Sequence, residues 1–182
     1  MTAPFSWAAQ SSVRQVLTAE DLHEQLSWHW ATDLRPRLDG LTSEEALWLP
    51  APGAWTVRRG ELQSSWPTPS PAPARTIGWH LGALGQDLAH RASAHFGDRT
   101  YNQHVPVEDL LGFVDRAYAA WTDGLLAVTP DRLARAHQGP PGTSDERYPL
   151  WAVVLHVNAE VLRHGACAVQ LRELRRSGQA GS

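Results

Sequence analysis

Apolar residues recur at intervals of three or four in four separate stretches of the chain, and this spacing limits the folds that it can adopt. The stretches lie at about 18–38, 76–96, 107–128 and 150–176. In the first of them, Leu22, Leu26, Trp30 and Leu34 follow one another at steps of four. Such spacing gives a helix one apolar face, whereas a half-buried strand needs alternation, and we find no convincing strand. The sequence therefore predicts an all-α fold, a four-helix bundle with long connections.

Proline-rich segments separate the predicted helices. Five prolines lie between Pro50 and Pro71, so this connection is expected to be mostly loop. A second loop is expected at 139–149, which begins with GPPG. A chain of 182 residues is long enough for one substantial core, so residues 1–182 are expected to form a single domain. Its ends, about 1–15 and 177–182, are predicted to be flexible.

The composition excludes several classes of function. All sixteen basic residues are arginine, which removes Schiff-base chemistry and a P-loop lysine. The net charge of −3, without a clustered basic face, argues against nucleic acid as a partner. No apolar stretch approaches the roughly 20 residues that a membrane span needs. The single cysteine, Cys167, fits a reducing compartment, so we expect a cytoplasmic location. We expect a monomer or homodimer whose partners are small molecules.

The segment HVNAEVLRH (156–164) places His156, Glu160 and His164 at steps of four along the last predicted helix. On a helical projection, Glu160 and His164 fall in the middle of the apolar stripe and His156 falls at its margin. A carboxylate inside a bundle is costly unless it is protonated, paired with arginine or bound to a metal. The spacing alone leaves two interpretations open, a buried Glu–His hydrogen bond and a metal site.

His80 adds a candidate ligand on a second predicted helix, where it shares a face with Ile77, Leu84 and Leu88. A histidine alone in that position is typical of a satisfied core residue. Together with Glu160 and His164, however, it supplies two nitrogens and one oxygen. Zinc uses this donor set in catalytic sites that keep a fourth position open. The sequence therefore favours a divalent metal site.

Other residues near the predicted site are candidates for supporting roles. Asp87 and Arg91 follow His80 on the same predicted face, where they could contact substrate or form an ion pair within the helix. The chain has nine tryptophans, several of which we expect to line a core or an apolar pocket. We take Arg91 and Trp55 as candidates for binding a co-substrate. His156 and Asp87 are the candidate catalytic acid–base residues.

Three segments resemble the DinB/YfiT-like superfamily: LDGLTSEEALWLPAPGAWTVR (38–58), TIGWHLGAL (76–84) and LHVNAEVLRHGA (155–166). The resemblance covers roughly residues 18–176. It is strongest to the actinobacterial branch that includes the metal-binding domain of mycothiol-dependent maleylpyruvate isomerase. It implies a four-helix bundle of the DinB/YfiT-like type that holds a divalent metal between its helices. Carried over by motif, the ligands are His80, Glu160 and His164.

The resemblance also implies an activity. Family members with known activity transfer or act through a low-molecular-weight thiol such as mycothiol or bacillithiol. The expected function is therefore a metal-dependent thiol S-transferase acting on a small electrophile, or a thiol-dependent isomerase, with zinc as the first choice and nickel, manganese or iron as others. Two alternatives stay open. One is a metal-dependent hydrolase or lyase with His156 or Asp87 as base; the other is a non-catalytic bundle in which the metal only stabilises the fold.

Overall fold

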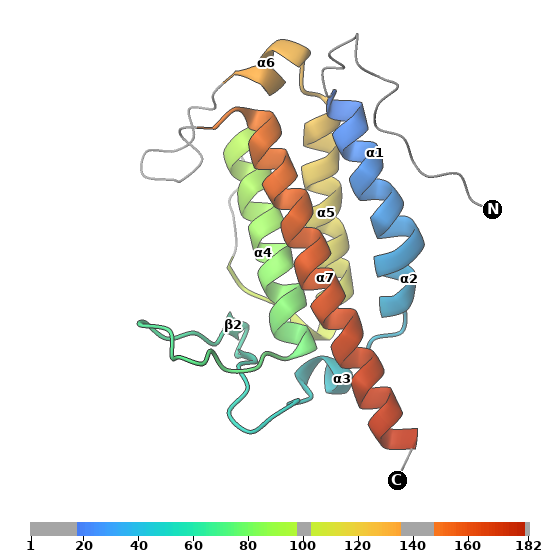
Figure 1. Cartoon of the computed structure of the whole chain (residues 1–182), viewed down its shortest axis with the longest axis vertical. Coiled ribbons are helices and arrows are strands. Elements are labelled where there is room, and N and C mark those ends of the chain that lie inside the picture. The colour runs from blue at the N-terminus through green and yellow to red at the C-terminus, as the bar shows by residue number, and fades with distance from the viewer. Residues whose placement is uncertain (1–17, 98–102, 136–147, 181–182) are drawn as a thin grey trace, which may run out of the picture.

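The structure, a computed structural model, describes residues 18–97, 103–135 and 148–180. The described chain is mostly helical, as the apolar periodicity predicts. Four long helical segments run side by side along the molecule (Figure 1). They are the continuous segment α1 (Ala19–His29), η2 (Trp30–Leu34) and α2 (Arg35–Leu38), then α4 (Ile77–Phe96), α5 (Leu110–Leu126) and α7 (Leu150–Ala180). Within the described ranges, no helix combines the length and hydropathy that a membrane span requires.

The first segment is continuous, although the turn in its middle is π-helical. Thr18 caps α1 through a capping box with Asp21, which satisfies backbone N–H groups of the first turn. The π turn begins at Trp30. The indole of Trp30 stacks on the ring of Tyr118 in α5, with the ring centroids 4.0 Å apart. This contact holds the first segment against α5.

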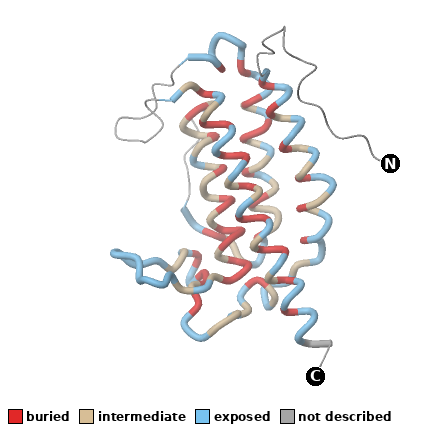
Figure 2. The backbone as a smooth tube through the Cα atoms, viewed as in Figure 1, coloured by how far each residue is buried: buried red, intermediate tan, exposed pale blue. Residues whose placement is uncertain are grey.

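The core lies between the four long segments (Figure 2). α4 packs chiefly against α5 and α7. The largest fully buried side chains come from all four segments and include Leu26, Leu34, Leu84, Leu88, Trp121, Leu125 and Val154. Removing their apolar surface from water is the main favourable contribution to folding. Gly78, in the first turn of α4, lets the short helix α3 (Ser43–Leu47) approach closely, since a Cβ there would lie 2.9 Å from the carbonyl oxygen of Ala46.

Arg172 of α7 anchors the chain that leads from α2 into α3. Its guanidinium is buried and donates to the carbonyl oxygens of Arg37 and Asp39 at 2.8 and 2.9 Å. It also forms a two-pronged ion pair with Glu45 of α3, with N···O distances of 3.1 and 3.0 Å. The hydrogen bond from Arg172 favours the carboxylate and lowers the pKa of Glu45 to about 2. These partners together compensate for the burial of a charged group.

A small hairpin corrects the prediction that the chain has no strand. β1 (Val57–Arg58) and β2 (Glu61–Leu62) pair antiparallel within the proline-rich connection. Positive φ angles at Arg59 and Gly60 form the tight two-residue turn between them. Strands of this length contain too few residues to show alternation in the sequence. The short helices α3 and α6 (Pro130–Ala134) were not predicted, because five residues are too few to show a helical repeat of apolar positions.

The observed helix boundaries lie close to the predicted ones. They differ at the start of the third predicted helix and at the end of the fourth. α4 begins directly after its N-cap Thr76, as predicted. The third predicted helix starts as a 3-10 turn, η3 (Val107–Asp109), before α5 begins. α7 continues past the predicted helix end at Arg176 to Ala180. The predicted flexible end at 1–15 lies outside the described residues.

Candidate metal centre

The first turn of α4 is fixed from outside the helix, and this determines where His80 points. The hydroxyl of Thr76 accepts a hydrogen bond from the backbone N–H of Trp79 at 3.1 Å, which caps α4. The backbone N–H of Thr76 donates to the carbonyl of Trp55, and the N–H of Trp55 donates to the carbonyl of Ala74, so that Trp55 and Arg75 form a short parallel bridge. The proline-rich connection is therefore tied to the start of α4, one turn before His80.

His80 and His164 meet between α4 and α7. Both side chains are buried, and their Nδ1 atoms lie 3.2 Å apart. On α7, His164 lies on the same buried face as Val161 and Ala168, as the helical projection predicts. The sequence prediction that His80 and His164 converge from two helices is therefore confirmed.

Both imidazoles are neutral at pH 7. Burial lowers the pKa of His80 to about 4, and the nearby His164 and Arg75 act in the same direction. Burial also lowers the pKa of His164 to about 4, with Arg163 adding to the effect and Glu160 opposing it. Two neutral rings in contact can share one hydrogen bond, one donating and one accepting. The neutral ring is also the form in which histidine binds a metal.

Trp79 packs against both histidines. Its ring lies edge-on to that of His80, with centroids 5.6 Å apart, and nearly parallel to that of His164, with centroids 6.0 Å apart. Its indole N–H donates to the backbone carbonyl of Gln63 at 2.8 Å, next to β2. The indole is thereby held on both its apolar and its polar side, and it restricts the two imidazoles in turn.

Glu160 lies beside His164 but does not face His80. Its side chain is 25% exposed, and the prediction that it sits in the middle of the apolar stripe is wrong, because the buried face of α7 extends round the helix through Val154 and Val169 and leaves Glu160 at its edge. At this edge the guanidinium of Arg163, three residues further along α7, donates to both oxygens of Glu160. The hydrogen bond from Arg163 lowers the pKa of Glu160. The same guanidinium lies 2.7 Å from Nε2 of His164.

The spacing of the two Nδ1 atoms is compatible with a hydrogen bond and also with one tetrahedral ion, whereas Glu160 does not complete a ligand set. Two nitrogens bound to one zinc at about 2.0–2.1 Å lie roughly 3.3 Å apart, close to the spacing of the two Nδ1 atoms. The Glu160 carboxylate approaches the opposite nitrogen of His164, Nε2, at 3.5 Å. Over the described ranges, no group of three or more His, Cys, Asp or Glu side chains is arranged to hold a metal ion. Shared ligation would require Glu160 to leave Arg163 and turn towards His80.

The remaining candidates lie around this pair rather than within it. Asp87 and Arg91 form an ion pair within α4, with an N···O distance of 3.1 Å. This is one of the two roles that the sequence suggested for them. His156 is exposed on α7, two turns before His164. The ring of Trp55 lies 6.5 Å from that of Trp79, centroid to centroid, and Arg75 lies over it. Trp55 is therefore next to Trp79, which packs on the two histidines.

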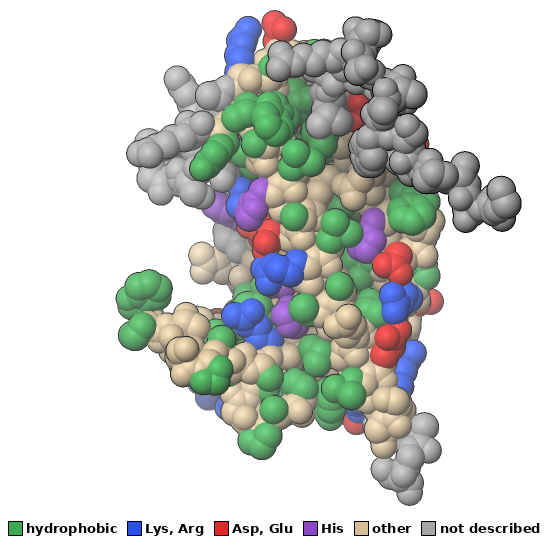
Figure 3. All heavy atoms as spheres, viewed as in Figure 1, with side chains coloured by type: hydrophobic (Ala, Val, Ile, Leu, Met, Phe, Trp, Pro, Cys, Tyr) green, Lys and Arg blue, Asp and Glu red, His purple; other side chains and the backbone are tan. Residues whose placement is uncertain are grey.

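Arginines surround the histidine pair, and the sequence analysis missed two of them. Arg75 places its guanidinium carbon 4.2 Å from the centroid of Trp79 and 5.7 Å from that of Trp55. Arg163 binds Glu160 as described. Figure 3 shows arginine side chains beside histidines on this face, where the surface is hollowed between the arm carrying β2 and the helices. The three-residue spacing of Glu160 and Arg163 was a usable signal; nothing in the sequence pairs Arg75 with Trp55.

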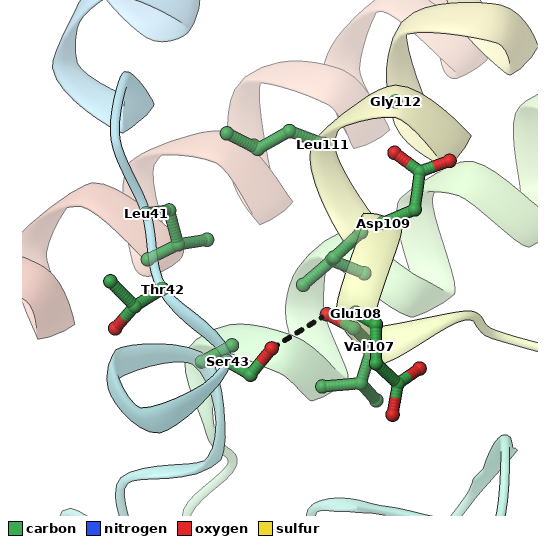
Figure 4. A pocket seen from close by; sticks show the side chains of 10 residues that line it. Leu41, Thr42, Ser43, Val107, Glu108, Asp109, Leu111 and Gly112 are labelled. Carbon is green, nitrogen blue, oxygen red and sulfur yellow. Dashed lines mark hydrogen bonds between the residues drawn. The ribbon is translucent and has the colours of Figure 1, made fainter.

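A pocket of about 290 Å³ lies elsewhere, between the chain before α3 and the start of α5. In Figure 4 its labelled side chains come from the two sides of this gap, and the Ser43 hydroxyl donates to the carbonyl of Val107 at 3.3 Å. None of the histidines or tryptophans named above lines this pocket. It therefore does not correspond to the tryptophan-lined pocket expected from the sequence.

Comparisons of the chain with protein-family models, with curated proteins and with solved structures found no match.

Proposed function

We propose that the chain is a four-helix bundle of the DinB/YfiT-like type that binds a divalent metal between α4 and α7 and uses it in thiol chemistry. The activity we propose is that of a metal-dependent thiol S-transferase acting on a small electrophile, or of a thiol-dependent isomerase. Zinc is the expected ion, with nickel, manganese or iron as others. The observation that carries this proposal is the spacing of the two buried, neutral imidazoles of His80 and His164.

The proposed ligands are His80, His164 and Glu160. The two imidazoles supply nitrogen donors that need no deprotonation at neutral pH. Glu160 is ionised and one helical turn from His164, so its carboxylate is available once Arg163 releases it. Trp79 limits the rotation of both rings and covers them from water. An ion bound by two nitrogens and one oxygen keeps a position open, at which it lowers the pKa of a coordinated thiol.

The surroundings of the histidine pair favour thiol chemistry over the hydrolase alternative. A hydrolase or lyase needs a general base next to the attacking water. His156 is exposed two turns away, and Asp87 is held in an ion pair with Arg91. Neither is placed as a free base beside His80 and His164. A cytoplasmic location belongs to the same proposal and is supported by the single cysteine, Cys167.

Metal analysis of protein purified without chelator tests the site. The wild type is expected to hold about one equivalent of metal, and His80→Ala and His164→Ala to lose most of it. His156→Ala is the matched control because His156 lies on the same helix but is exposed, and it should retain the metal. Equal metal content in the wild type and His164→Ala would leave the hydrogen-bonded histidine pair as the better interpretation.

Activity assays with a panel of electrophiles test the reaction. Turnover should require both the metal and an added low-molecular-weight thiol, and Glu160→Gln should reduce it by weakening the hold on the ion. A substrate that turns over at the same rate without thiol would favour the hydrolase or lyase. Metal content that does not support turnover with any electrophile would favour the non-catalytic bundle.

A further inference from the structure

Among the described residues, Arg75 lies at the edge of the candidate site without an anionic partner. It directly precedes Thr76, the N-cap of α4, and its guanidinium lies over the rings of Trp79 and Trp55. Its Nε is buried and has no hydrogen-bond acceptor. Within the part of the chain that the structure describes, the Arg75 side chain takes part in no hydrogen bond or ion pair. A guanidinium so placed retains its capacity to bind an anion.

The charges around the histidine pair leave Arg75 as the surplus cation. Two arginines lie close to the pair: Arg75, which stacks on Trp79, and Arg163, whose guanidinium contacts His164. Arg91 is paired with Asp87, and Arg163 with Glu160. The guanidinium of Arg75 lies on the ring of Trp79, which contacts both histidines, and this places its charge close to them. An anionic ligand at the site would complete the pairing.

The stacking of Arg75 also selects the shape of the anion. Trp79 covers one side of the guanidinium and Trp55 lies on an adjacent side, while Nε is buried, so the terminal N–H groups remain available in one plane. A planar carboxylate matches this edge with two parallel hydrogen bonds. An apolar body attached to that carboxylate would lie next to the indoles of Trp55 and Trp79, which favours burial of apolar surface.

We propose that Arg75 binds the carboxylate of the small molecule that acts at the His80–His164 site, so that the ligand class is an organic acid with an apolar body. This inference rests on the proposed function for the chemistry that follows binding. The binding step itself depends only on Arg75 and its tryptophans. Arg75 is thus a specificity-determining residue for an anionic ligand.

Calorimetric titration with benzoate, a planar carboxylate on an apolar ring, tests the proposal. Wild type is expected to bind benzoate, and Arg75→Gln to bind it on the order of ten-fold more weakly or not at all, since a charge-assisted hydrogen bond is lost. Arg75→Lys keeps the charge without the planar fork and should be intermediate. The matched control is Arg135→Gln, because Arg135 is 78% exposed and forms a surface ion pair far along the chain; it should bind like wild type.

Two further measurements keep the result interpretable. Benzamide, the neutral analogue, should bind wild type much more weakly than benzoate, and inorganic phosphate tests whether any oxyanion suffices. Benzoate should shift the indole N–H resonance of Trp79 in a ¹H–¹⁵N spectrum, which also reports that each variant is folded. Equal benzoate affinity in wild type and Arg75→Gln, no binding to wild type, or phosphate binding in place of benzoate would each overturn the proposal.

Metal content, measured on the same samples, separates this inference from the proposed function. If benzoate binding depends on Arg75 in protein that holds no metal, the carboxylate site stands and the metal-based function fails. If the protein holds metal at His80 and His164 but benzoate does not bind, the metal site stands and the carboxylate site fails.

Discussion

His80 and His164 face each other through Nδ1 atoms 3.2 Å apart, although 84 residues separate them in the sequence. Each residue along an α-helix is rotated by about 100° from the last, so a shift of one residue in either helix would turn one imidazole away. The contact therefore requires that α4 and α7 keep their relative register. Packing at the ends of α4 and α7 therefore helps to keep the two imidazoles facing each other.

Arg163→Met should strengthen metal binding several-fold. The substitution keeps much of the side chain but removes the guanidinium that holds Glu160 and approaches Nε2 of His164. Releasing a partly exposed ion pair frees the carboxylate, and removing the positive charge favours a cation nearby. Competition with a chelating dye measures the zinc affinity, and Arg135→Met serves as the control. A lower affinity in Arg163→Met would show that this arginine supports the ligand set instead of competing with the ion.

Glu45→Gln should destabilise the protein by about 2–4 kcal/mol at pH 7, because it leaves the buried Arg172 without its carboxylate. The effect should depend on pH with a defined sign. The pKa of Glu45 is lowered to about 2 in the folded protein from 4.5, so its stabilisation is fully present above about pH 4.5 and is lost as the pH falls towards 2.

Urea unfolding of wild type and Glu45→Gln across this pH range checks that prediction. Glu173→Gln is the comparison variant, because Glu173 forms a surface ion pair with Arg37 and is 60% exposed; it should change the free energy of unfolding little. A difference between wild type and Glu45→Gln that stays constant down to pH 2 would contradict the role of the carboxylate.

Gly78→Ala should destabilise the fold by about 1–3 kcal/mol through overpacking. The added Cβ would lie 2.9 Å from the backbone carbonyl oxygen of Ala46, so α3 or the start of α4 would have to move. Thermal unfolding measures the loss. Gly178→Ala is the matched control, since a Cβ there meets nothing within 4 Å. Similar melting temperatures for both variants and wild type would show that α3 yields without cost.

Trp79→Phe should lower the free energy of unfolding by about 1 kcal/mol in addition to the loss caused by the smaller ring, because the carbonyl of Gln63 loses its indole donor. The expected result in denaturant unfolding is a lower midpoint with an unchanged slope. Trp66→Phe provides the comparison, as Trp66 is 94% exposed and should be neutral. If the two substitutions had the same effect, the hydrogen bond to Gln63 would contribute nothing measurable.

The long helices and the histidine pair could be predicted because both depend on periodicity. His80 and His164 each share a face with apolar neighbours, and the faces of two packed helices meet. The position of Glu160 was mispredicted because the buried face of α7 extends round the helix through Val154 and Val169, which leaves Glu160 at its edge. There its carboxylate pairs with Arg163, three residues further on.

Contacts made by the aperiodic connection could not be predicted. Trp55 and Arg75 are twenty positions apart and pair in a parallel bridge, so the chain between them reverses direction more than once, and the hairpin turn at Arg59 and Gly60 is one of these reversals. No spacing rule links residues across such a segment. The same reasoning applies to Gln63, whose backbone carbonyl, and not its side chain, receives the indole N–H of Trp79.

The π turn in the first segment explains how a repeat of four can keep one face buried. Leu22, Leu26, Trp30, Leu34 and Leu38 are all buried, yet each step of four in an α-helix overshoots a full turn by about 40°. Over the whole segment the drift would reach roughly 160° and bring one end of the row out into water. The wider π turn takes up more residues per revolution and reverses part of that rotation. Deleting a single residue from this turn would convert it to a regular α-helical turn and keep both Leu22 and Leu38 on the buried face.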